Sequence, residues 1–331
     1  MRSSTSGSDA SGARLRRAAR LLLAGCAVVA LSAEAAARLA LDRASKMQQR
    51  IVSEYRGARQ IGCDRRTAQT HILVVGNSLL DEGVHFDRVR TGLGEACDAR
   101  RLVVEQTVYF DWYYGIKALL DGGARPDIVV VVMSPSQWVR PDSRGDYSAQ
   151  YLFQGADLPD AARDLDLSMT QKASFVLARV SKFWGARAEM RNFVLIHLMP
   201  DLGRMMNFSS YIDPTPIVDD EIAQRAQARI ERLNGVVRAH GGRLVILVPP
   251  VLDANDGAAG LARAARSSAV PVIRPVASGT YGKSLYRDTG FHLNAEGAAI
   301  FTEQFVRALR TEVRAAETTP RAVATSGRSA S

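Results

Sequence analysis

The stretch HILVVGNSLLDEGV, residues 71–84, decides the fold class. Its first half is a continuous run of apolar residues, which is typical of a strand that is buried on both faces. Gly76-Asn77-Ser78 ends this run, and the residues from 79 onward have a helical pattern. A strand, a tight turn and a helix in this order predict one βα unit of a parallel sheet.

Four more apolar runs of similar length follow along the chain, and helical patterns separate them. The strands are expected at 71–76, 101–106, 127–133, 243–249 and 270–274, and the helices at 79–92, 112–122, 222–239, 257–266 and 295–314. This alternation predicts an α/β fold, a three-layer αβα flavodoxin-like sandwich around a five-stranded parallel sheet. Residues 134–220 are too many for one crossover, so we expect a helical insertion within a domain that spans 71–316.

The composition fits a globular protein and excludes several function classes. Hydrophobic residues make up 47% of the 331 residues and charged residues 23%, which excludes a disordered, collagen-like or multi-span membrane protein. The net charge of +9 comes from scattered basic residues, so we expect no nucleic-acid partner. No cluster of His, Cys and acidic residues has the spacing of metal ligands, and we expect neither a metal nor a cofactor.

The first 70 residues have the pattern of a targeting segment. A basic segment, residues 1–20, precedes the apolar run 21–41, which is long enough to span a bilayer as a helix. We favour a retained signal anchor. A cleaved signal peptide with Ala33-Glu34-Ala35 as its site, a lipoprotein signal at Cys26 and an amphipathic helix of a cytosolic protein remain open. Residues 43–70 are then a polar stalk, and 317–331 a disordered tail.

Basic residues flank both ends of the apolar run, so charge alone does not orient the chain. Cys63 lies shortly before the first predicted strand and Cys97 shortly before the second. If these strands are adjacent and parallel, both begin at the same edge of the sheet, and a Cys63–Cys97 disulfide is geometrically reasonable. Such a bond requires an oxidising compartment and favours an extracytoplasmic domain; two unpaired cysteines in loops are the alternative.

A second candidate segment, YRDTGFHLNAEGAAIF, covers residues 286–301. His292 follows an acid, Asp288, and precedes a helix whose start is marked by Asn294. A histidine at the carboxyl edge of a parallel sheet can act as the general base for a serine, and a nearby acid can orient its ring. Ser78 follows the first strand, at the edge where such sheets bind ligands. The two segments together predict a nucleophile and its base.

The strand–Gly-Asn-Ser–helix segment and the late Asp…His-Leu-Asn segment resemble those of the SGNH (GDSL-like) hydrolase family. The resemblance covers about 71–133 and 222–314. It implies that Ser78 is the nucleophile and that Asp288 and His292 complete a triad. The segment Ser134–Phe153 resembles a membrane-tethered, extracytoplasmic branch of the family, whose members are related to proteins of cell-envelope polymer O-acylation.

Four positions depart from the family pattern. Asn77 replaces the usual Asp before the serine and is a candidate for the oxyanion and substrate site. Asp288 lies four residues before His292, where three is usual. No second-block glycine is evident in the loop 106–115, so Asp111 or a neighbour is the candidate for the oxyanion and substrate site. The third-block Asn is absent, and Ser134 or Ser136 is the expected substitute. Loss of one oxyanion donor typically costs about 10²–10³ in rate, which predicts weak hydrolysis or a need for a partner.

The sequence therefore predicts an extracytoplasmic serine esterase or O-acyltransferase. The resemblance implies acyl esters, with acetyl as the expected group, of a cell-envelope glycan or polymer. It also implies a membrane-bound O-acyltransferase as a partner and a single-pass location in the cell membrane with a periplasmic catalytic domain. The alternative is a non-catalytic SGNH-like module that binds glycan or serves as a scaffold in a membrane acyltransferase assembly.

Overall fold

A single parallel sheet organises the chain. The structure is a computed structural model that describes residues 7–43, 45–63, 68–191, 218–287 and 289–318. Its strands pair in parallel in the order β2-β1-β3-β4-β5. The strands are β1 Thr70–Gly76, β2 Cys97–Val103, β3 Ile128–Val132, β4 Arg243–Leu247 and β5 Val272–Ile273. The predicted five-stranded parallel α/β fold is confirmed, with β1 between β2 and β3.

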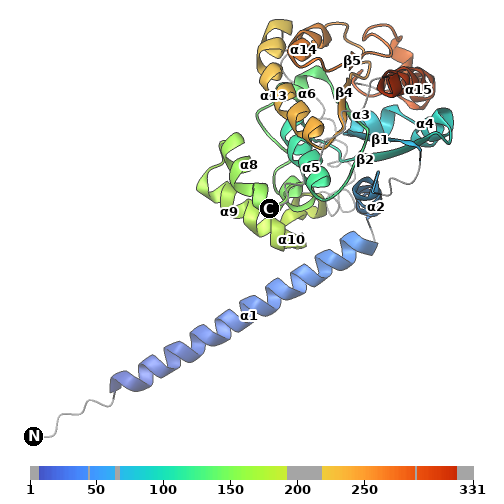
Figure 1. The fold of residues 1–331 in the computed structure, drawn as a ribbon. Coiled ribbons are helices and arrows are strands. Elements are labelled where there is room, and N and C mark those ends of the chain that lie inside the picture. Colours follow the sequence, from blue (N-terminus) through green and yellow to red (C-terminus); the bar gives the residue numbers. More distant parts are fainter. Residues whose placement is uncertain (1–6, 44, 64–67, 192–217, 288, 319–331) are drawn as a thin grey trace, which may run out of the picture.

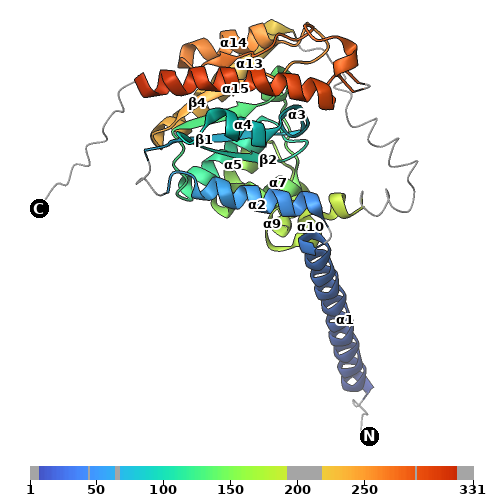
Figure 2. The same ribbon diagram turned by 90° about the vertical axis from the view of Figure 1, so that its right-hand side faces the viewer.

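Helices cover both faces of this sheet, as Figures 1 and 2 show. Alternate strand residues point to opposite faces: Leu73 and Val75 lie in one core, and Ile72 and Val74 lie in the other. The first core packs against α2 (Lys46–Gln60), α5 (Tyr109–Asp121), α13 (Asp219–Ala239) and α14 (Ala258–Ala265). The second packs against α3 (Ser78–Gly83), α4 (Phe86–Leu93) and α15 (Ala295–Thr318). These are the three layers expected from the sequence.

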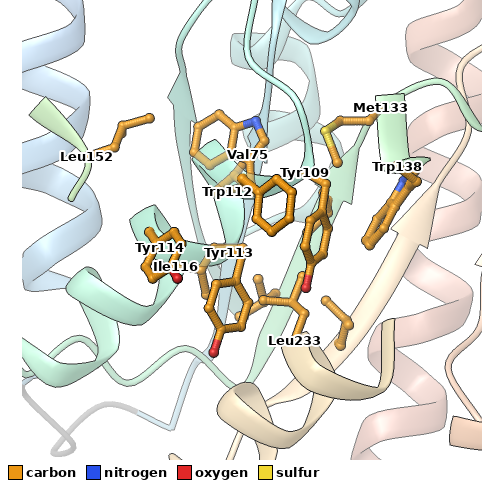
Figure 3. Close-up of a cluster of buried hydrophobic side chains, with 14 of the residues drawn as sticks. Val75, Tyr109, Trp112, Tyr113, Tyr114, Ile116, Met133, Trp138, Leu152 and Leu233 are labelled. Atoms are coloured by element: carbon orange, nitrogen blue, oxygen red, sulfur yellow. The ribbon is translucent and has the colours of Figure 1, made fainter. Parts of the chain in front are cut away.

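Aromatic side chains of α5 fill the first core, as Figure 3 shows. Trp112 is fully buried, and Tyr109 lies between the ring of Tyr113 at 5.9 Å and the ring of Trp138 at 5.9 Å. Rings of this size bury large apolar areas and pack in tilted or edge-on pairs. Because Trp138 belongs to α6 (Pro135–Val139), this cluster fixes the start of the insertion to the sheet.

The described part of the insertion extends this core. Its further α-helices are α7 (Asp146–Tyr151), α8 (Leu158–Asp164), α9 (Met169–Val180) and α10 (Lys182–Gly185). Leu152, Phe153 and Phe175 are buried in the same cluster as the α5 rings. The expected helical insertion is therefore present up to residue 191, and residues 192–217 lie outside the described residues.

The predicted stalk is wrong, because most of it belongs to the domain. Residues 46–60 form α2, whose Ile51 and Ala58 are buried in the first core together with Ile61. Ile51 and Ala58 are seven positions apart and lie on one face of the helix, and the residues between them in the sequence are mostly polar. Strand β2 also begins earlier than expected, at Cys97, since an edge strand tolerates polar residues such as Asp98 and Arg100.

The predicted disulfide is not formed. Cys63 follows the end of α2, and its Sγ lies 3.4 Å from the carbonyl oxygens of Arg59 and Gly123. Cys97 is within β2 and pairs with Thr70, which lies seven positions beyond Cys63 in the chain. Because β2 begins earlier than the sequence suggests, Cys97 lies within the strand and not in the loop before it. The argument for an oxidising compartment that rested on this bond has no support in the structure.

The N-terminal helix α1 (Gly7–Arg43) extends away from the domain, and only its C-terminal part contacts it (Figures 1 and 2). Residues Arg14–Arg43 are long and apolar enough to cross a membrane, although a signal sequence has the same properties. Leu21, Leu22 and Leu23 are exposed, whereas Ala37 and Leu41 are buried against the domain. At the other terminus α15 continues to Thr318, and the rest of the predicted tail lies outside the described residues.

Candidate active site

Ser78 is positioned by the end of strand β1, which lies between β2 and β3. Gly76 ends this strand, and a Cβ there would lie 2.6 Å from the carbonyl oxygen of Val132 on β3, so no larger residue fits without displacing backbone. Asn77 is the N-cap of α3, and Ser78 is its first residue. The nucleophile candidate therefore sits directly on the carboxyl edge of the sheet, where ligands bind in open α/β folds.

The side chain of Asn77 joins the two loops beside Ser78. Its Oδ1 accepts a hydrogen bond from the Leu79 amide at 3.1 Å, and its Nδ2 donates to the Thr107 carbonyl at 2.9 Å. The residue is fully buried. Both polar atoms are thus used by the backbone. Asn77 thus fixes the loop after β2 against the start of α3, and its contact with substrate stays a prediction.

His292 is presented by a turn that packs against the same edge. Tyr286 and Leu293 form an isolated antiparallel bridge, and the Arg287 amide donates to the His292 carbonyl at 2.8 Å. Gly290, with a φ of 71°, lies in the turn, and its carbonyl accepts from the Leu252 amide at 2.8 Å. These backbone bonds fix the orientation from which the imidazole projects.

The structure brings Ser78 and His292 together. The distance from Ser78 Oγ to His292 Nε2 is 2.9 Å, which is a hydrogen bond. Both side chains are buried, with 8% and 4% of their surface exposed. Burial, together with the positive charge of Arg287, lowers the pKa of His292 to about 4. The imidazole is therefore neutral at pH 7, the state in which a ring nitrogen can accept the serine proton.

Asp288, the predicted third member of the triad, lies outside the described residues. Its neighbour Arg287 forms an ion pair with Glu82 of α3 at 2.8 Å. Burial raises the pKa of Glu82, and Arg287 counteracts this. The ion pair ties the histidine-bearing turn to the helix that begins with Ser78.

Asp111 joins the start of α5 to the insertion. Its carboxylate is fully buried and accepts hydrogen bonds from the amides of Val108 at 2.8 Å and Arg144 at 2.9 Å. Burial raises its pKa to about 6, and the hydrogen bonds it accepts offset part of that rise. Its place at the oxyanion and substrate site stays a prediction.

Gln106, in the loop after β2, was not selected from the sequence as a residue of special conformation. Its φ of 59° lies in the left-handed region, which glycine adopts most readily. The loop is held beside Ser78, because the neighbouring Thr107 carbonyl accepts from Asn77 and the Val104 amide donates to the Gly76 carbonyl. In the sequence, the position of Gln106 at the end of the second expected strand is the feature that could have indicated a turn here.

Ser134 and Ser136 follow β3 at the same edge. Because Gly76 of β1 pairs with Val132 of β3, Ser134 is level with Ser78 along the sheet. The two hydroxyls lie 3.1 Å apart, and the Ser134 amide donates to Gln137 Oε1 at 3.0 Å. Ser134 is buried as the N-cap of α6, and Ser136 is partly exposed. Both remain candidates for substrate contact.

A cavity lies near this edge but is not lined by Ser78 or His292. It has a volume of about 510 Å³ between α2, α4 and β2, and its lining includes Asp81, His85, Arg90 and Arg101. Over the part of the chain that the structure describes, no group of three or more His, Cys, Asp or Glu side chains is arranged to hold a metal ion.

Comparisons with known proteins give fold-level likeness only. No protein-family model matches the sequence, and no curated protein matches it. Among solved structures, similarity is found to a mutant of an acetyl-xylooligosaccharide esterase from Geobacillus, with 13% identity and a TM-score of 0.37 over 72% of this chain and 94% of that one.

Two further structures are similar to the same degree. A catalytic mutant of an acetylxylan esterase from Geobacillus stearothermophilus is 12% identical, with a TM-score of 0.38 over 73% of this chain and 95% of that one. A carbohydrate esterase family 3 protein from Talaromyces cellulolyticus is 12% identical, with a TM-score of 0.39 over 75% and 99%. At these TM-scores the alignments assign no role to any residue of this chain.

Proposed function

We propose that this chain is an SGNH-like serine esterase or O-acyltransferase that works through an acyl-serine intermediate. The observation that carries the proposal is the 2.9 Å contact between Ser78 Oγ and the neutral, buried imidazole of His292. A hydroxyl bonded to a ring nitrogen at the carboxyl edge of a parallel sheet is the arrangement of an activated serine.

In the proposed reaction Ser78 Oγ attacks the carbonyl carbon of an ester, and His292 Nε2 accepts the hydroxyl proton. The tetrahedral intermediate collapses, the C–O bond to the alcohol breaks, and His292 returns the proton to the leaving oxygen. Water or a second hydroxyl then attacks the acyl-serine with His292 as base. Water gives hydrolysis, and a sugar or polymer hydroxyl gives transfer.

Backbone amides are the proposed oxyanion donors. The Leu79 amide is used by Asn77 Oδ1, and the next two amides donate to the Asn77 carbonyl. In the first turn of α3 this leaves the Ser78 amide without an acceptor among the described residues. The amide of Gln106, in the loop that Asn77 holds beside it, is the proposed second donor. A backbone amide can donate whatever its side chain is, so these two amides can take the place of the oxyanion donor that the family's Asn supplies.

Asp288 is proposed to orient His292. A histidine whose pKa is about 4 is a weak base, because burial disfavours the imidazolium that forms when it accepts a proton. A carboxylate beside the ring would stabilise that cation, and a substitution Asp288→Asn should then lower the rate without loss of the fold.

The proposed substrates are acyl esters, with acetyl as the expected group, of a cell-envelope glycan or polymer. This part of the proposal is supported by the resemblance of the sequence to a membrane-tethered branch of the SGNH family. A membrane-bound O-acyltransferase that supplies acyl groups is the proposed partner. The test is acetyl release from, or transfer to, isolated envelope polysaccharide, with and without membranes that contain the candidate partner.

The proposed location is the cell membrane, with α1 as a retained single-pass anchor and the domain in the periplasm. The support for retention is Glu34, whose carboxylate accepts hydrogen bonds from Ser181 Oγ and from the amides of Lys182 and Phe183 at the start of α10. Cleavage after Ala35 would remove this acceptor from the folded domain. Intact mass of the chain purified from membranes tests retention, and reporter fusions after α1 test the orientation.

The experiment that tests the activity is labelling of the full chain with a fluorophosphonate probe, read by intact mass. We expect one adduct on the wild type and none on Ser78→Ala or His292→Ala. Ser168→Ala is a matched control, because Ser168 is an exposed N-cap of α9 outside the site, and its adduct should equal that of the wild type.

A folded wild type that forms no adduct would overturn the proposal. The Ser78–His292 pair would then be a buried hydrogen bond in a non-catalytic module, and the glycan-binding or scaffold function would take its place. If an adduct forms, release of the acyl group in water and in the presence of a polyhydroxyl acceptor separates hydrolysis from transfer.

A further inference from the structure

Helix α9 carries an apolar stripe on its outer face. Met169, Val176, Leu177 and Val180 are 78%, 57%, 45% and 69% exposed, and Phe183 continues the stripe into α10 with 39% exposed. We call these five residues the α9–α10 stripe. Val176, Leu177 and Val180 lie seven, eight and eleven positions after Met169, which places all four on one face of the helix. A contiguous apolar surface of this kind marks an interaction site more often than scattered exposed residues do.

The opposite face of α9 is already occupied by the domain. Phe175 and Ala178 are buried in the first core, beneath the α5 rings. The helix is therefore apolar on two sides, one packed inside the protein and the other open to its surroundings. Among the residues that the structure describes, burial inside the domain explains the first side only.

The stripe lies beside the point where α1 meets the domain. Glu34 of α1 accepts hydrogen bonds from the amides of Lys182 and Phe183, and Lys182 Nζ contacts Asp42 Oδ1 at 2.7 Å. Figures 1 and 2 both show α10 against the C-terminal part of α1. The exposed side of α9 and α10 thus continues from the helix that is apolar enough to cross a membrane.

The length of α1 indicates how deep in a bilayer the contact between α1 and α10 would lie. Residues 21–33, which precede the junction, rise by only about 20 Å, whereas the hydrocarbon core of a bilayer is about 30 Å thick. Residues 34–41 supply about 12 Å more. If α1 spans the bilayer, residues 34–41 must lie within it or at its interface. The same depth then applies to α10, which is hydrogen-bonded to Glu34.

Basic residues lie where such a surface would meet lipid headgroups. Lys172 and Arg179 flank the stripe on α9. Arg43 ends α1 and Lys46 begins α2, and all four side chains are exposed. The acids nearest the junction are engaged, Asp42 by Lys182 and Asp146 by Arg187. An apolar face with a basic border is the pattern of helices that lie in the interface of an anionic membrane.

We propose that the α9–α10 stripe lies in the interfacial region of the bilayer that α1 spans, so that the domain rests on the membrane surface through this face. The inference rests on the proposed anchoring by α1. The layer of the first core, which includes α9, then faces the bilayer, and the layer with α3, α4 and α15 faces away from it. The bound occupant is lipid, with anionic headgroups along the basic border.

The experiment places a fluorescent nitrobenzoxadiazole probe on single cysteines in the full chain, after Cys26→Ala, Cys63→Ser and Cys97→Ala. Val180→Cys reports on the stripe. Ile300→Cys is the matched control, an exposed apolar residue at 38% on α15 in the opposite layer. Both variants are reconstituted in vesicles of phosphatidylcholine and phosphatidylglycerol, with and without doxyl-labelled lipid.

We expect a blue-shifted emission at position 180, quenched by doxyl lipid and protected from aqueous iodide. Position 300 should be quenched by iodide and insensitive to doxyl lipid. Equal iodide quenching at both positions would overturn the inference. So would protection at 180 without doxyl quenching, because protein and not lipid would then cover the stripe.

Alkaline carbonate extraction of the same vesicles separates this inference from the anchoring on which it rests. A chain that carbonate removes is not anchored by α1, and the proposed location fails. A chain that carbonate retains, with an aqueous probe at position 180, is anchored while the stripe stays in water, and only the present inference fails.

Discussion

The two segments that meet at the candidate site are positioned in different ways. Gly76-Asn77-Ser78 continues an internal strand of the sheet, and β2 and β3 flank it with backbone hydrogen bonds. His292 lies in a segment that is held by one antiparallel bridge and by a few bonds to loops. The proposed nucleophile is thus fixed by the fold as a whole, and its proposed base by local contacts.

Because of this difference, changes in the two segments should affect different properties of the protein. A change at the serine segment disturbs paired strands and should lower the stability of the whole domain. A change at the histidine segment disturbs a turn and should chiefly alter the position or the pKa of the imidazole. The predictions below test that separation, from the largest expected effect to the smallest.

The largest effect is expected when either member of the pair is removed. Ser78→Ala and His292→Ala should each lower kcat by about 10⁴- to 10⁶-fold, because nucleophile and base act as one unit. The double variant should be no slower than the slower single variant. Steady-state kinetics with an activated acetyl ester checks this. Additive losses would mean that the two residues act separately.

Next in size is the effect of a methyl group at the glycine of each segment. Gly76→Ala should lower the free energy of unfolding by about 3 kcal/mol, because the new Cβ would meet the Val132 carbonyl at 2.6 Å. Gly290→Ala should cost only about 1–2 kcal/mol, since the strain of a φ of 71° is local and the Leu252 side chain can shift. Urea unfolding measures both, and a larger loss at Gly290 would reverse the comparison.

Substitution of the asparagine cap should likewise cost more stability at the serine segment than at the histidine segment. Asn77→Ala leaves the Thr107 carbonyl and the Leu79 amide unpaired in a fully buried place, which should cost about 2–3 kcal/mol. Asn294→Ala removes a partly exposed cap of α15 that accepts from the amides of Glu296 and Gly297, which should cost about 1 kcal/mol. Thermal unfolding of the pair tests this; equal shifts in Tm would argue that burial does not separate the two segments.

The smallest effect concerns the pH profile. His292 must be neutral to accept a proton, so kcat/KM should fall as the pH drops through about 4, the lowered pKa of His292, and not through the ordinary value near 6.5. Arg287→Gln removes a positive charge and should raise that pKa, moving the acid limb upward. Because burial is the larger cause, the limb should stay below 6.5. A profile that does not move would mean that Arg287 does not act on the imidazole.

The sequence was sufficient for the parts of the fold and site that depend on local pattern. The run HILVVG predicts strand β1, and Asn294 marks the start of the last helix correctly. Ser78 and His292 were selected as a pair from two such patterns, and the structure brings them within hydrogen-bond distance.

The errors arose where long-range packing decides. Residues 46–60 are polar enough to suggest a stalk, yet Ile51 and Ala58 dock the helix on the core. The sequence also does not reveal that the amide of Arg144, which is distant along the chain, donates to the carboxylate of Asp111. The left-handed turn at Gln106 likewise depends on contacts with β1 that no local pattern encodes.

The separation of Ser78 and His292 along the chain determines when, during synthesis, the two residues can first come together. The two residues are 214 positions apart, and the histidine turn belongs to the last βα unit before the C-terminal helix. While the chain is being synthesised, Ser78, the proposed nucleophile, has no base, and its hydroxyl is as unreactive as that of any other serine. If Ser78 and His292 act as the proposed pair, the activated serine arises only after nearly the whole polypeptide has been made and folded.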